Sequence, residues 1–365
     1  MKGIYLTQDL SHADGINDKI KKQVEQFLEA NIQIELRSNT IRTGLTLVRN
    51  LIPFFSKQYF NVNLHWKEYD FVYIRKGAVL DLSVVHLVKV IKNQNPSIKI
   101  ILEIPTYPYM DEFPLSIKWD VVYKEKLATP YLSKYIDRVV TYSDDKEIFN
   151  IPCINISNAY EFKGKPQFKT KTDDTINFIA VASLMYYHGY DRIINGLIQY
   201  YQKNQNSQKV IFTLIGDGPV LKDYKKIVEK NGASSYIFLV GRKSGVELFP
   251  YYLDADIAVD SLGRHRSKIY YNSTLKGKEY LAKGLPIISG VKTDLDERKD
   301  FPYYYRVLAN DTEINISDIV DFYNKVMCGK DKKEVASEIY NYGKNNFSFG
   351  VTFRPIINYL KESVK

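Results

Sequence analysis

The residues best suited to chemistry cluster between positions 273 and 286, in the stretch STLKGKEYLAKGLP. Ser273 is a favourable N-cap, Leu275, Tyr280 and Leu281 can pack a short helix, and Gly284 can end it. A helix start leaves N–H groups without partners inside the helix and carries the positive end of the helix dipole. The pattern therefore predicts a short helix whose beginning suits a pyrophosphate group.

Three side chains near this helix start suit a ligand that contains a pyrophosphate and a ribose. Thr274 adds a polar group beside the predicted cap, Lys276 adds a mobile positive charge, and Glu279 follows about one turn later. A carboxylate at that distance can accept hydrogen bonds from a ribose diol. A surface helix with ordinary charged residues has the same composition, so the stretch alone leaves both interpretations open.

Other candidates in this half of the chain directly follow apolar runs of strand length. They are Ser183, His188 and Gly189 after Ile176–Ala182, Gly216 and Gly218 after Val210–Ile215, and Gly241 and Arg242 after Tyr236–Val240. Glycine lets a backbone or a ligand approach closely, and dinucleotide-binding folds place phosphates after their first strand. Plain strand-to-helix turns and a structural histidine are the alternative interpretation.

These positions need a scaffold of parallel strands, and the chain has the pattern for one. Most strand candidates are continuous apolar runs, typical of parallel strands buried on both faces. Helical patterns separate them, as in Ile16–Ala30. The strand candidates are Lys2–Leu6, Ile32–Leu36, Phe71–Ile74, Lys99–Ile104, Arg138–Tyr142, Cys153–Ile156, Ile176–Ala182, Val210–Ile215, Tyr236–Val240, Asp256–Val259, Leu285–Ser289 and Tyr305–Leu308.

The alternation predicts an α/β protein with two Rossmann-like, doubly wound domains. We expect an N-terminal domain over residues 1–160, a polar linker over 161–175 and a C-terminal domain over 176–345. A final helix over 346–365 could cross back to the N-terminal domain. Two such domains are expected to face each other across a cleft, where open α/β sheets bind ligands.

Composition narrows the class of protein. The chain has 365 residues, 45% of them hydrophobic, which suits two cores rather than disorder. Two cysteines build no disulfide framework, and no apolar run approaches the length of a membrane span. The N-terminus reads as a first strand rather than a signal peptide. We therefore expect a cytoplasmic protein, with a peripheral contact on the inner face of the cell membrane left open.

The order and spacing of several motifs resemble retaining GT-B glycosyltransferases of the glycosyltransferase 4 type. The C-terminal markers are VASLMYYHGYDRII, LIGDGP, FLVGR, YLDADIAVDSL and LKGKEYLAKGLPII. Weaker N-terminal markers, ILEIPTYPYMDE, IDRVVTYS and INISNAYEF, look like segments of bacterial capsule and exopolysaccharide transferases. The resemblance covers nearly the whole chain and implies the GT-B fold, with the donor bound by the C-terminal domain.

The chain departs from that family's pattern at the donor phosphates and the donor sugar. The family's Arg and Lys after the first C-terminal strand correspond to Ser183 and His188. Of two glutamates eight residues apart, Glu279 matches the second, which implies a ribose contact, whereas the first is Tyr271. The basic run 264–268 (RHRSK) offers replacement cations.

We expect Arg266 of this run to take over the bidentate phosphate contact, with Lys268 beside it. A plain basic surface loop is the alternative.

The resemblance implies transfer of a hexosyl unit from a nucleoside diphosphate sugar, most commonly a UDP-sugar, to a hydroxyl group with retention of configuration. The acceptor would be a glycan, glycolipid or glycoprotein of bacterial surface glycan synthesis. Lys276, Arg266 and N–H groups near Ser273 and Thr274 would stabilise the leaving diphosphate without a metal or other cofactor. Asp254-Ala255-Asp256 has the spacing of a metal site but matches the family's helix-to-strand junction.

Acceptor-side candidates come from N-terminal strand ends and loops, and they are Asp14, Gly15, Arg75, Thr106 and Tyr107. Glu103 could hydrogen-bond an acceptor hydroxyl or act as a base. A structural carboxylate that caps a turn is the alternative for Glu103.

Charge and apolar patterning leave the partners open. The formal net charge of +9 could favour anionic lipid, nucleic acid or phosphorylated substrates, or could simply reflect a Lys-rich composition. Leu47–Phe60 mixes apolar residues with Arg49 and Lys57, so it could rest on an anionic membrane or form a core helix broken at Pro53.

Two other functions compete with glycosyl transfer. A sugar-nucleotide 2-epimerase would use the same donor pocket with acid–base groups in the cleft. A basic nucleic-acid-binding module is disfavoured, because no helix-turn-helix, zinc-finger or aromatic RNA-platform pattern occurs and the basic residues form no dense block. The sequence makes no prediction about oligomeric state.

Overall fold

The computed structural model describes residues 1–8, 14–41, 58–59, 64–77, 79–113, 115–170, 173–203, 208–298 and 300–364. The chain forms two compact units. The first consists of Met1–Ser157 together with Phe349–Lys365, and the second of Asn158–Ser348. Residues 47–57 and 60, which make up most of the predicted membrane segment, lie outside the described residues.

The first unit is built on a seven-stranded sheet with the order β2-β1-β5-β6-β7-β9-β8. All neighbours in it are parallel except β8 and β9. The strands are β1 (Lys2–Thr7), β2 (Gln33–Ser38), β5 (Phe71–Arg75), β6 (Lys99–Ile104), β7 (Arg138–Thr141), β8 (Glu147–Ile148) and β9 (Ile151–Asn155), with a separate antiparallel pair of β3 (Thr40–Ile41) and β4 (Gln58–Tyr59). The order reverses between β1 and β5, so this is a doubly wound sheet.

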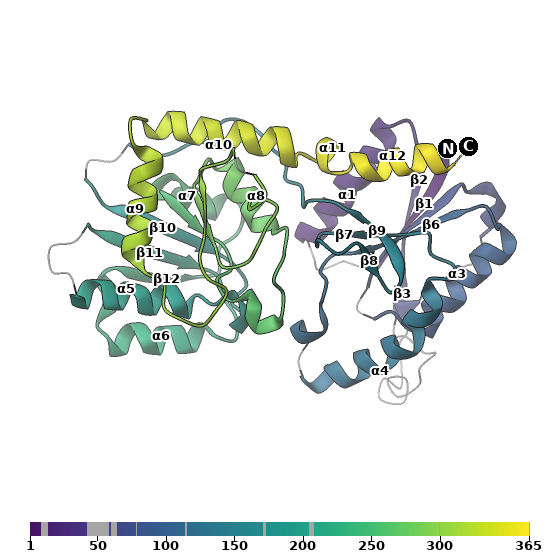
Figure 1. Ribbon diagram of the computed structural model, residues 1–365, viewed down its shortest axis with the longest axis horizontal. Coiled ribbons are helices and arrows are strands. Elements are labelled where there is room, and N and C mark those ends of the chain that lie inside the picture. Colours follow the sequence, from purple (N-terminus) through teal and green to yellow (C-terminus); the bar gives the residue numbers. More distant parts are fainter. Residues whose placement is uncertain are drawn as a thin grey trace. The chain divides into compact units, whose positions relative to one another are not determined.

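Helices cover both faces of the first sheet, and each face has its own apolar core (Figure 1). One core joins the sheet to α3 (Leu82–Gln94) and the end of α4 (Leu115–Leu132). The other joins it to α1 (Asp14–Glu29) and α12 (Arg354–Ser363), which follows the short α11 (Phe349–Thr352). Phe27 of α1 packs edge-on against Phe353, so the C-terminal residues complete the core of the first unit.

The second unit is built on a six-stranded parallel sheet with the order β12-β11-β10-β13-β14-β15. The strands are β10 (Ile176–Val181), β11 (Val210–Ile215), β12 (Ile237–Gly241), β13 (Ile257–Val259), β14 (Ile287–Ser289) and β15 (Tyr304–Arg306). In order of appearance this is 3-2-1-4-5-6, the Rossmann order, with the reversal between β10 and β13. Ligands of such sheets bind where the carboxyl ends of the strands flank the reversal.

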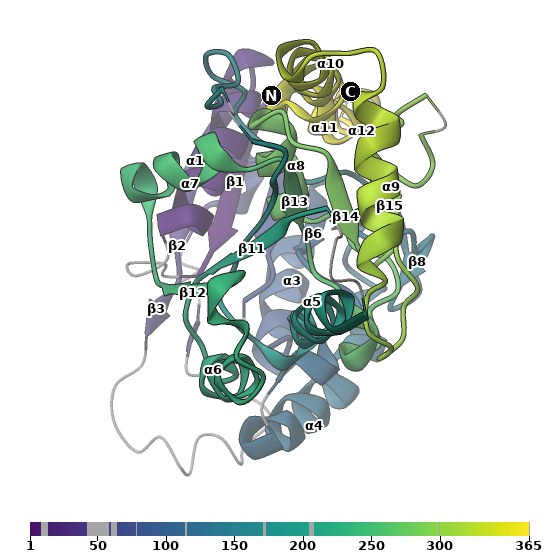
Figure 2. The same ribbon diagram turned by 90° about the vertical axis from the view of Figure 1, so that its left-hand side faces the viewer.

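Helices also cover both faces of the second sheet (Figure 2, in which α5, α6 and α10 are seen nearly end-on). One core contains α5 (Asp191–Lys203), α6 (Leu221–Lys230) and the start of α9 (Ile316–Met327). The other contains α7 (Phe249–Asp254), α8 (Leu275–Ala282) and α10 (Lys332–Phe347). The predicted α/β class with two doubly wound sheets is therefore confirmed.

Every predicted strand exists in the structure, with ends that agree within two residues. The predicted helix over Ile16–Ala30 is α1, in which Ile20 and Phe27 are buried while Ile16 and Leu28 are exposed. The predicted last helix is divided into α11 and α12 at Phe353.

Candidate donor site on the second unit

The carboxyl ends of β10, β11 and β12 surround a cavity of about 460 Å³. Four residues singled out in the sequence, Ser183, Gly216, Gly218 and Arg242, lie on its wall. The other lining residues are Val181, Ala182, Ile215, Asp217 and Lys243. The structure therefore brings candidates from three separate strand ends to one place, beside the reversal of strand order.

Glycines at these strand ends allow the loops to touch each other. Gly216 has a φ of 145°, and a Cβ atom there would lie 1.8 Å from the carbonyl oxygen of Ala182. Gly189 has a φ of 66°, and its Cβ would lie 2.6 Å from the backbone nitrogen of Gly263. Both positions therefore require glycine for backbone packing, and they hold the loops after β10, β11 and β13 together.

Lys276 lies on the β13 side of the same edge. Its Nζ is 2.9 Å from Ser261 Oγ, 3.3 Å from the hydroxyl of Tyr190 and 3.4 Å from Asp260 Oδ1. Burial lowers the pKa of Lys276 to about 8, although the carboxylate of Asp260 raises it. The Lys276 side chain is 21% exposed.

The start of α8 is held against the end of β13 by one side chain. Thr274 caps the helix by accepting a hydrogen bond from the N–H of Gly277 (3.1 Å). Its hydroxyl also donates to Asp260 Oδ2 at 2.5 Å. The N–H groups of Leu275 and Lys276 belong to the first turn, which has no partners within the helix for them.

The prediction that Ser273 caps α8 is wrong by one residue. Ser273 is buried, donates to Asp294 Oδ2 at 2.6 Å and accepts from the backbone N–H of Asn158 at 2.8 Å. Ser273 therefore connects Asn158, the first residue of the second unit, to the segment just before α8. Leu275, predicted to pack the helix, is 42% exposed, because it occupies the first helical position at the open edge.

His188 is a neutral structural residue rather than a cation. Burial first, and then the charges of Lys276 and Arg264, lower the pKa of His188 far below its usual range. Its Nδ1 accepts the backbone N–H of Met185 at 3.2 Å, and its ring stacks on Tyr190. His188 therefore shapes the loop after β10 and does not replace the family's lysine as a charge.

Arg266 does not fit its predicted role as the phosphate-binding cation. Two of its nitrogens form a bidentate pair with Asp191 at 2.7 and 2.8 Å, and Nε donates to Asp311 at 2.6 Å. A further bond reaches the backbone oxygen of Tyr186 at 3.0 Å. Because carboxylates of the protein occupy the guanidinium, Arg266 joins the loop after β13 to the start of α5 and to residue 311.

Arg264 belongs to the same basic run. Its guanidinium carbon lies 4.7 Å from the ring centre of Tyr187, and its charge lowers the pKa of both Lys276 and His188. It therefore adds positive potential beside Lys276. The sequence analysis chose Arg266 from this run and could not foresee its pairing with Asp191 and Asp311, because these residues are distant in the chain.

Glu279 lies on α8, one turn after Lys276. Its Oε1 accepts the hydroxyl of Tyr252 at 3.0 Å, and burial raises the pKa of its carboxyl group. Tyr252, which the sequence did not single out, orients this carboxylate. Lys268 ends the short helix Arg264–Ser267 in a left-handed conformation with its side chain exposed, and Gly241 has a φ of 83° at the end of β12.

The first unit contains a buried polar cluster centred on Glu103. The carboxylate is fully buried and accepts hydrogen bonds from the hydroxyls of Tyr73 (2.8 Å) and Tyr142 (2.9 Å), while pairing with Arg75. Longer contacts of 3.3 Å come from Tyr5 and Gln23. With both oxygens occupied and no exposure, Glu103 has the contacts of a structural carboxylate, and Arg75 is its counter-ion.

The remaining acceptor-side candidates lie elsewhere in the first unit. Asp14 and Gly15 are the first residues of α1, and only their backbone is described. Thr106 and Tyr107 follow β6, where Tyr107 packs edge-on against Tyr109 and Phe149.

Asp256 has structural partners. Its Oδ1 lies 2.8 Å from Lys332 Nζ, and its Oδ2 accepts the backbone N–H of Asn177 at 2.8 Å. Across the described ranges no group of three or more His, Cys, Asp or Glu side chains is arranged to hold a metal ion. A membrane-spanning helix is likewise not found among the described residues.

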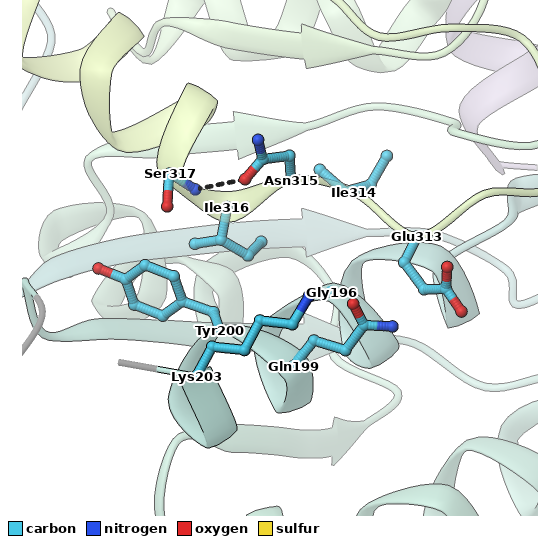
Figure 3. Close-up of a pocket in the computed structure, with 9 residues that line it drawn as sticks. All are labelled: Gly196, Gln199, Tyr200, Lys203, Glu313, Ile314, Asn315, Ile316 and Ser317. Carbon is cyan, nitrogen blue, oxygen red and sulfur yellow. Dashed lines mark hydrogen bonds between the residues drawn. The ribbon is translucent and has the colours of Figure 1, made fainter. Parts of the chain in front are cut away.

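A second cavity of about 270 Å³ lies between α5 and the start of α9 (Figure 3). Its wall is formed by Gly196, Gln199, Tyr200 and Lys203 of α5 and by the segment Glu313–Ser317. Asn315 caps α9 there by accepting the N–H of Ser317. This cavity shares no lining residue with the one at the strand ends, so we do not assign it to the donor.

Comparison with known proteins supports the fold. No family model matches the chain. The chain is 26% identical over 163 residues to α-monoglucosyldiacylglycerol synthase of Acholeplasma laidlawii, a match that covers 42% of this chain and 39% of that protein.

Two solved structures are similar over nearly their whole length. A glycosyltransferase of Rickettsia africae has a TM-score of 0.64 at 13% identity, covering 100% of this chain and 99% of that one. HepE of Anabaena, solved with UDP, has a TM-score of 0.62 at 13% identity, covering 99% and 100%. The chain therefore has the GT-B fold of these glycosyltransferases, with the Rossmann order in its second unit.

Proposed function

We propose that the chain is a glycosyltransferase that moves a hexosyl unit from a nucleoside diphosphate sugar to an acceptor hydroxyl. The observation that carries the proposal is the edge of the second sheet, where Lys276, Arg264 and the first turn of α8 gather beside the reversal of strand order. The similar HepE was solved with UDP and with UDP-glucose, which supports UDP as the nucleotide.

Different residues would bind the diphosphate, the ribose and the base of the donor. Lys276, Arg264 and the N–H groups of Leu275 and Lys276 would bind the diphosphate, since two positive charges lie close to the start of a helix. Glu279, oriented by Tyr252, would accept hydrogen bonds from the ribose diol. The cavity lined by Ser183, Gly216, Gly218 and Arg242 would hold the base.

Catalysis would rest on stabilising the charge that develops on the departing diphosphate. Lys276 and Arg264 would provide that stabilisation from fixed positions. A retaining reaction with departure and attack on the same face of the sugar needs no protein nucleophile, so no carboxylate takes that role in this scheme. The same two cations would make the transfer independent of a metal ion, which activity in excess chelator tests directly.

The acceptor and the biological setting belong to the same proposal. The name of the similar Acholeplasma laidlawii protein describes a glucosylated diacylglycerol product, which supports a glycolipid acceptor within bacterial surface glycoconjugate synthesis. Thr106, Tyr107 and the start of α1 remain the proposed acceptor side. Arg75 and Glu103 are left out, because they are buried against each other.

The test is a two-stage assay with the full chain. A panel of nucleoside diphosphate sugars is first scored by thermal shift, since a ligand that binds only the folded state raises the melting temperature. The best donor is then incubated with glycan and glycolipid acceptors, with release of nucleoside diphosphate and a glycosylated product expected. Conversion of the donor sugar without any acceptor would instead indicate an epimerase, and failure of every donor to bind would refute the proposal.

A further inference from the structure

Asp260 is a buried carboxylate at the edge where we propose that the donor binds. It directly follows β13 and is 1% exposed. Its Oδ2 accepts the hydroxyl of Thr274 at 2.5 Å, and its Oδ1 accepts the backbone N–H of Ser261 at 2.7 Å. Its Oδ1 also lies 3.4 Å from Lys276 Nζ. Buried charges in proteins are ordinarily paired and hydrogen-bonded, and Asp260 has both kinds of partner.

A carboxylate is an unexpected group in a site for an anion. Like charges repel each other, so Asp260 by itself would weaken the binding of a diphosphate. Its pair with Lys276 has the opposite effect, because the carboxylate fixes the position of the ammonium group and opposes the loss of its proton. Asp260 therefore stabilises the cation that the proposed reaction needs.

A second lysine of α8 has a pair of the same chemistry in a closed environment. Lys278 pairs with Asp294, whose Oδ2 accepts the hydroxyl of Ser273 at 2.6 Å. The Lys278 side chain is 1% exposed, and its Nζ lies 4.0 Å from the ring centre of Phe347. The Lys276 side chain, by contrast, is 21% exposed. The two pairs therefore differ in the exposure of the lysine, which makes the Lys278 pair a structural counterpart of the Lys276 pair.

Polar groups from several elements face Lys276 besides Asp260. They are the hydroxyl groups of Tyr190 and Ser261, the guanidinium group of Arg264 and the neutral ring of His188. Burial lowers the pKa of Lys276 most, Arg264 lowers it further, and Asp260 raises it. Asp260 thus contributes a negative charge that opposes both burial and the positive charge of Arg264.

We propose that Asp260 is a positioning residue of the donor site, which holds the ammonium group of Lys276 at the start of α8 and sets the pH range in which the site binds an anion. This role rests on the proposed donor site and adds control of its charge. Asp260 does not touch the donor in this scheme. It acts through Lys276 and through Thr274, the cap of α8.

Asp260→Asn tests the proposal, because it removes the charge and keeps an oxygen that can accept the hydroxyl of Thr274. Without the carboxylate, Lys276 should lose its proton at a lower pH than in the parent chain. The affinity for UDP, measured by calorimetry between about pH 6 and pH 9, should therefore begin to fall at a lower pH. Relative to the parent chain, the affinity of the variant should fall about tenfold or more over this range.

The low end of the pH range separates this effect from general damage to the site. There Lys276 is protonated in both proteins, and Asp260→Asn should bind UDP about as tightly as the parent chain, because the repulsive carboxylate is gone. Ionisation of the UDP phosphates is the same for both proteins, so it does not affect the ratio of their affinities.

Asp294→Asn is the matched control. It removes the carboxylate of the other pair on α8 and should lower the melting temperature, because Lys278 is left buried without its partner. The pH dependence of UDP binding should follow that of the parent chain, since the lysine affected is Lys278 rather than Lys276. If Asp260→Asn does not fold, Asp260→Ser, which also lacks the charge and has a smaller side chain, takes its place.

The charge of Lys276 can also be followed without a donor. Only a neutral amine reacts with acetic anhydride, so the acetylation of Lys276 against pH, measured by mass spectrometry of its peptide, reports the ionisation of this lysine. Acetylation should begin at a lower pH in Asp260→Asn than in the parent chain. In Asp294→Asn it should follow the parent chain.

Two results would overturn the role of Asp260 and leave the donor site in place. Acetylation of Lys276 could follow the same pH curve in the parent chain and in Asp260→Asn, or the variant could bind UDP more weakly by the same factor at every pH. Absence of UDP binding by the parent chain would instead refute the proposed donor site, and the role of Asp260 with it.

Discussion

At the residue scale, Lys276 is the cation on which the proposed donor site depends. Lys276→Ala should lower kcat/KM for the donor by about 10²–10³-fold, because the charge on the leaving diphosphate loses its main partner. Lys276→Arg should keep part of the activity. Steady-state kinetics measure both, and an unchanged melting temperature of the free variants excludes unfolding as the cause.

The lowered pKa of Lys276 gives donor binding a pH dependence with a definite sign. In the protein without a bound donor, Lys276 has a pKa of about 8, and only its protonated form attracts a diphosphate. Affinity should therefore be constant well below pH 8 and fall as the pH rises through it, and binding near pH 8 should take up protons. Calorimetry in buffers of different ionisation enthalpy measures that uptake, which Lys276→Arg should abolish.

Substitution of Arg264 should affect donor binding, whereas substitution of Arg266 should affect stability. Arg264→Ala is expected to weaken donor binding about tenfold or more without a large change in melting temperature. Arg266→Ala breaks the pairs with Asp191 and Asp311 and should cost about 1–2 kcal/mol of stability, since these groups are partly exposed. If Arg266→Ala lost donor affinity while keeping its stability, the assignment would be reversed.

At the element scale, the hydroxyl of Thr274 positions α8 by capping it and by binding Asp260. Thr274→Ala should cost about 1–2 kcal/mol, from the lost cap and the lost hydrogen bond to Asp260, and should also raise the KM for the donor. Thr274→Ser keeps the hydroxyl and serves as the matched control. Thermal unfolding and donor kinetics check the two effects, and a stable Thr274→Ala with normal KM would contradict the role of the cap.

The strands were predictable from the sequence because each is a short apolar run bounded by polar or glycine residues. Lys99–Ile104 and Val210–Ile215 even have the predicted ends. Contacts between distant residues were not predictable. The partners of Arg266 are 75 and 45 positions away, and Glu103 meets Tyr5 and Tyr142 only when the sheet forms.

The exposed side of α4 was likewise not predictable from the sequence. Its outer and inner sides are both apolar, so periodicity alone does not reveal which one packs against the unit. Only the fold distinguishes the exposed Trp119 from the buried Val121.

At the scale of the whole molecule, each unit has its own cores, so their stabilities can be perturbed separately. Glu103→Gln leaves Arg75 buried without its carboxylate and should destabilise the first unit by about 3 kcal/mol. Glu68→Gln, which breaks an exposed pair with Lys2, should cost less than about 1 kcal/mol. Calorimetry should show a lower melting temperature for Glu103→Gln than for Glu68→Gln. An equal effect of both changes would contradict the structural role of Glu103.

The central claim is that the second unit binds a nucleoside diphosphate sugar at the edge formed by Lys276 and α8. Isothermal titration of UDP and UDP-glucose into the parent chain and into Lys276→Ala tests it most directly. We expect saturable binding to the parent chain and a loss of about 2 kcal/mol or more in binding free energy in the variant, in line with a charged hydrogen bond. Equal affinity of the two proteins, or no binding of any nucleoside diphosphate to the parent chain, would contradict it.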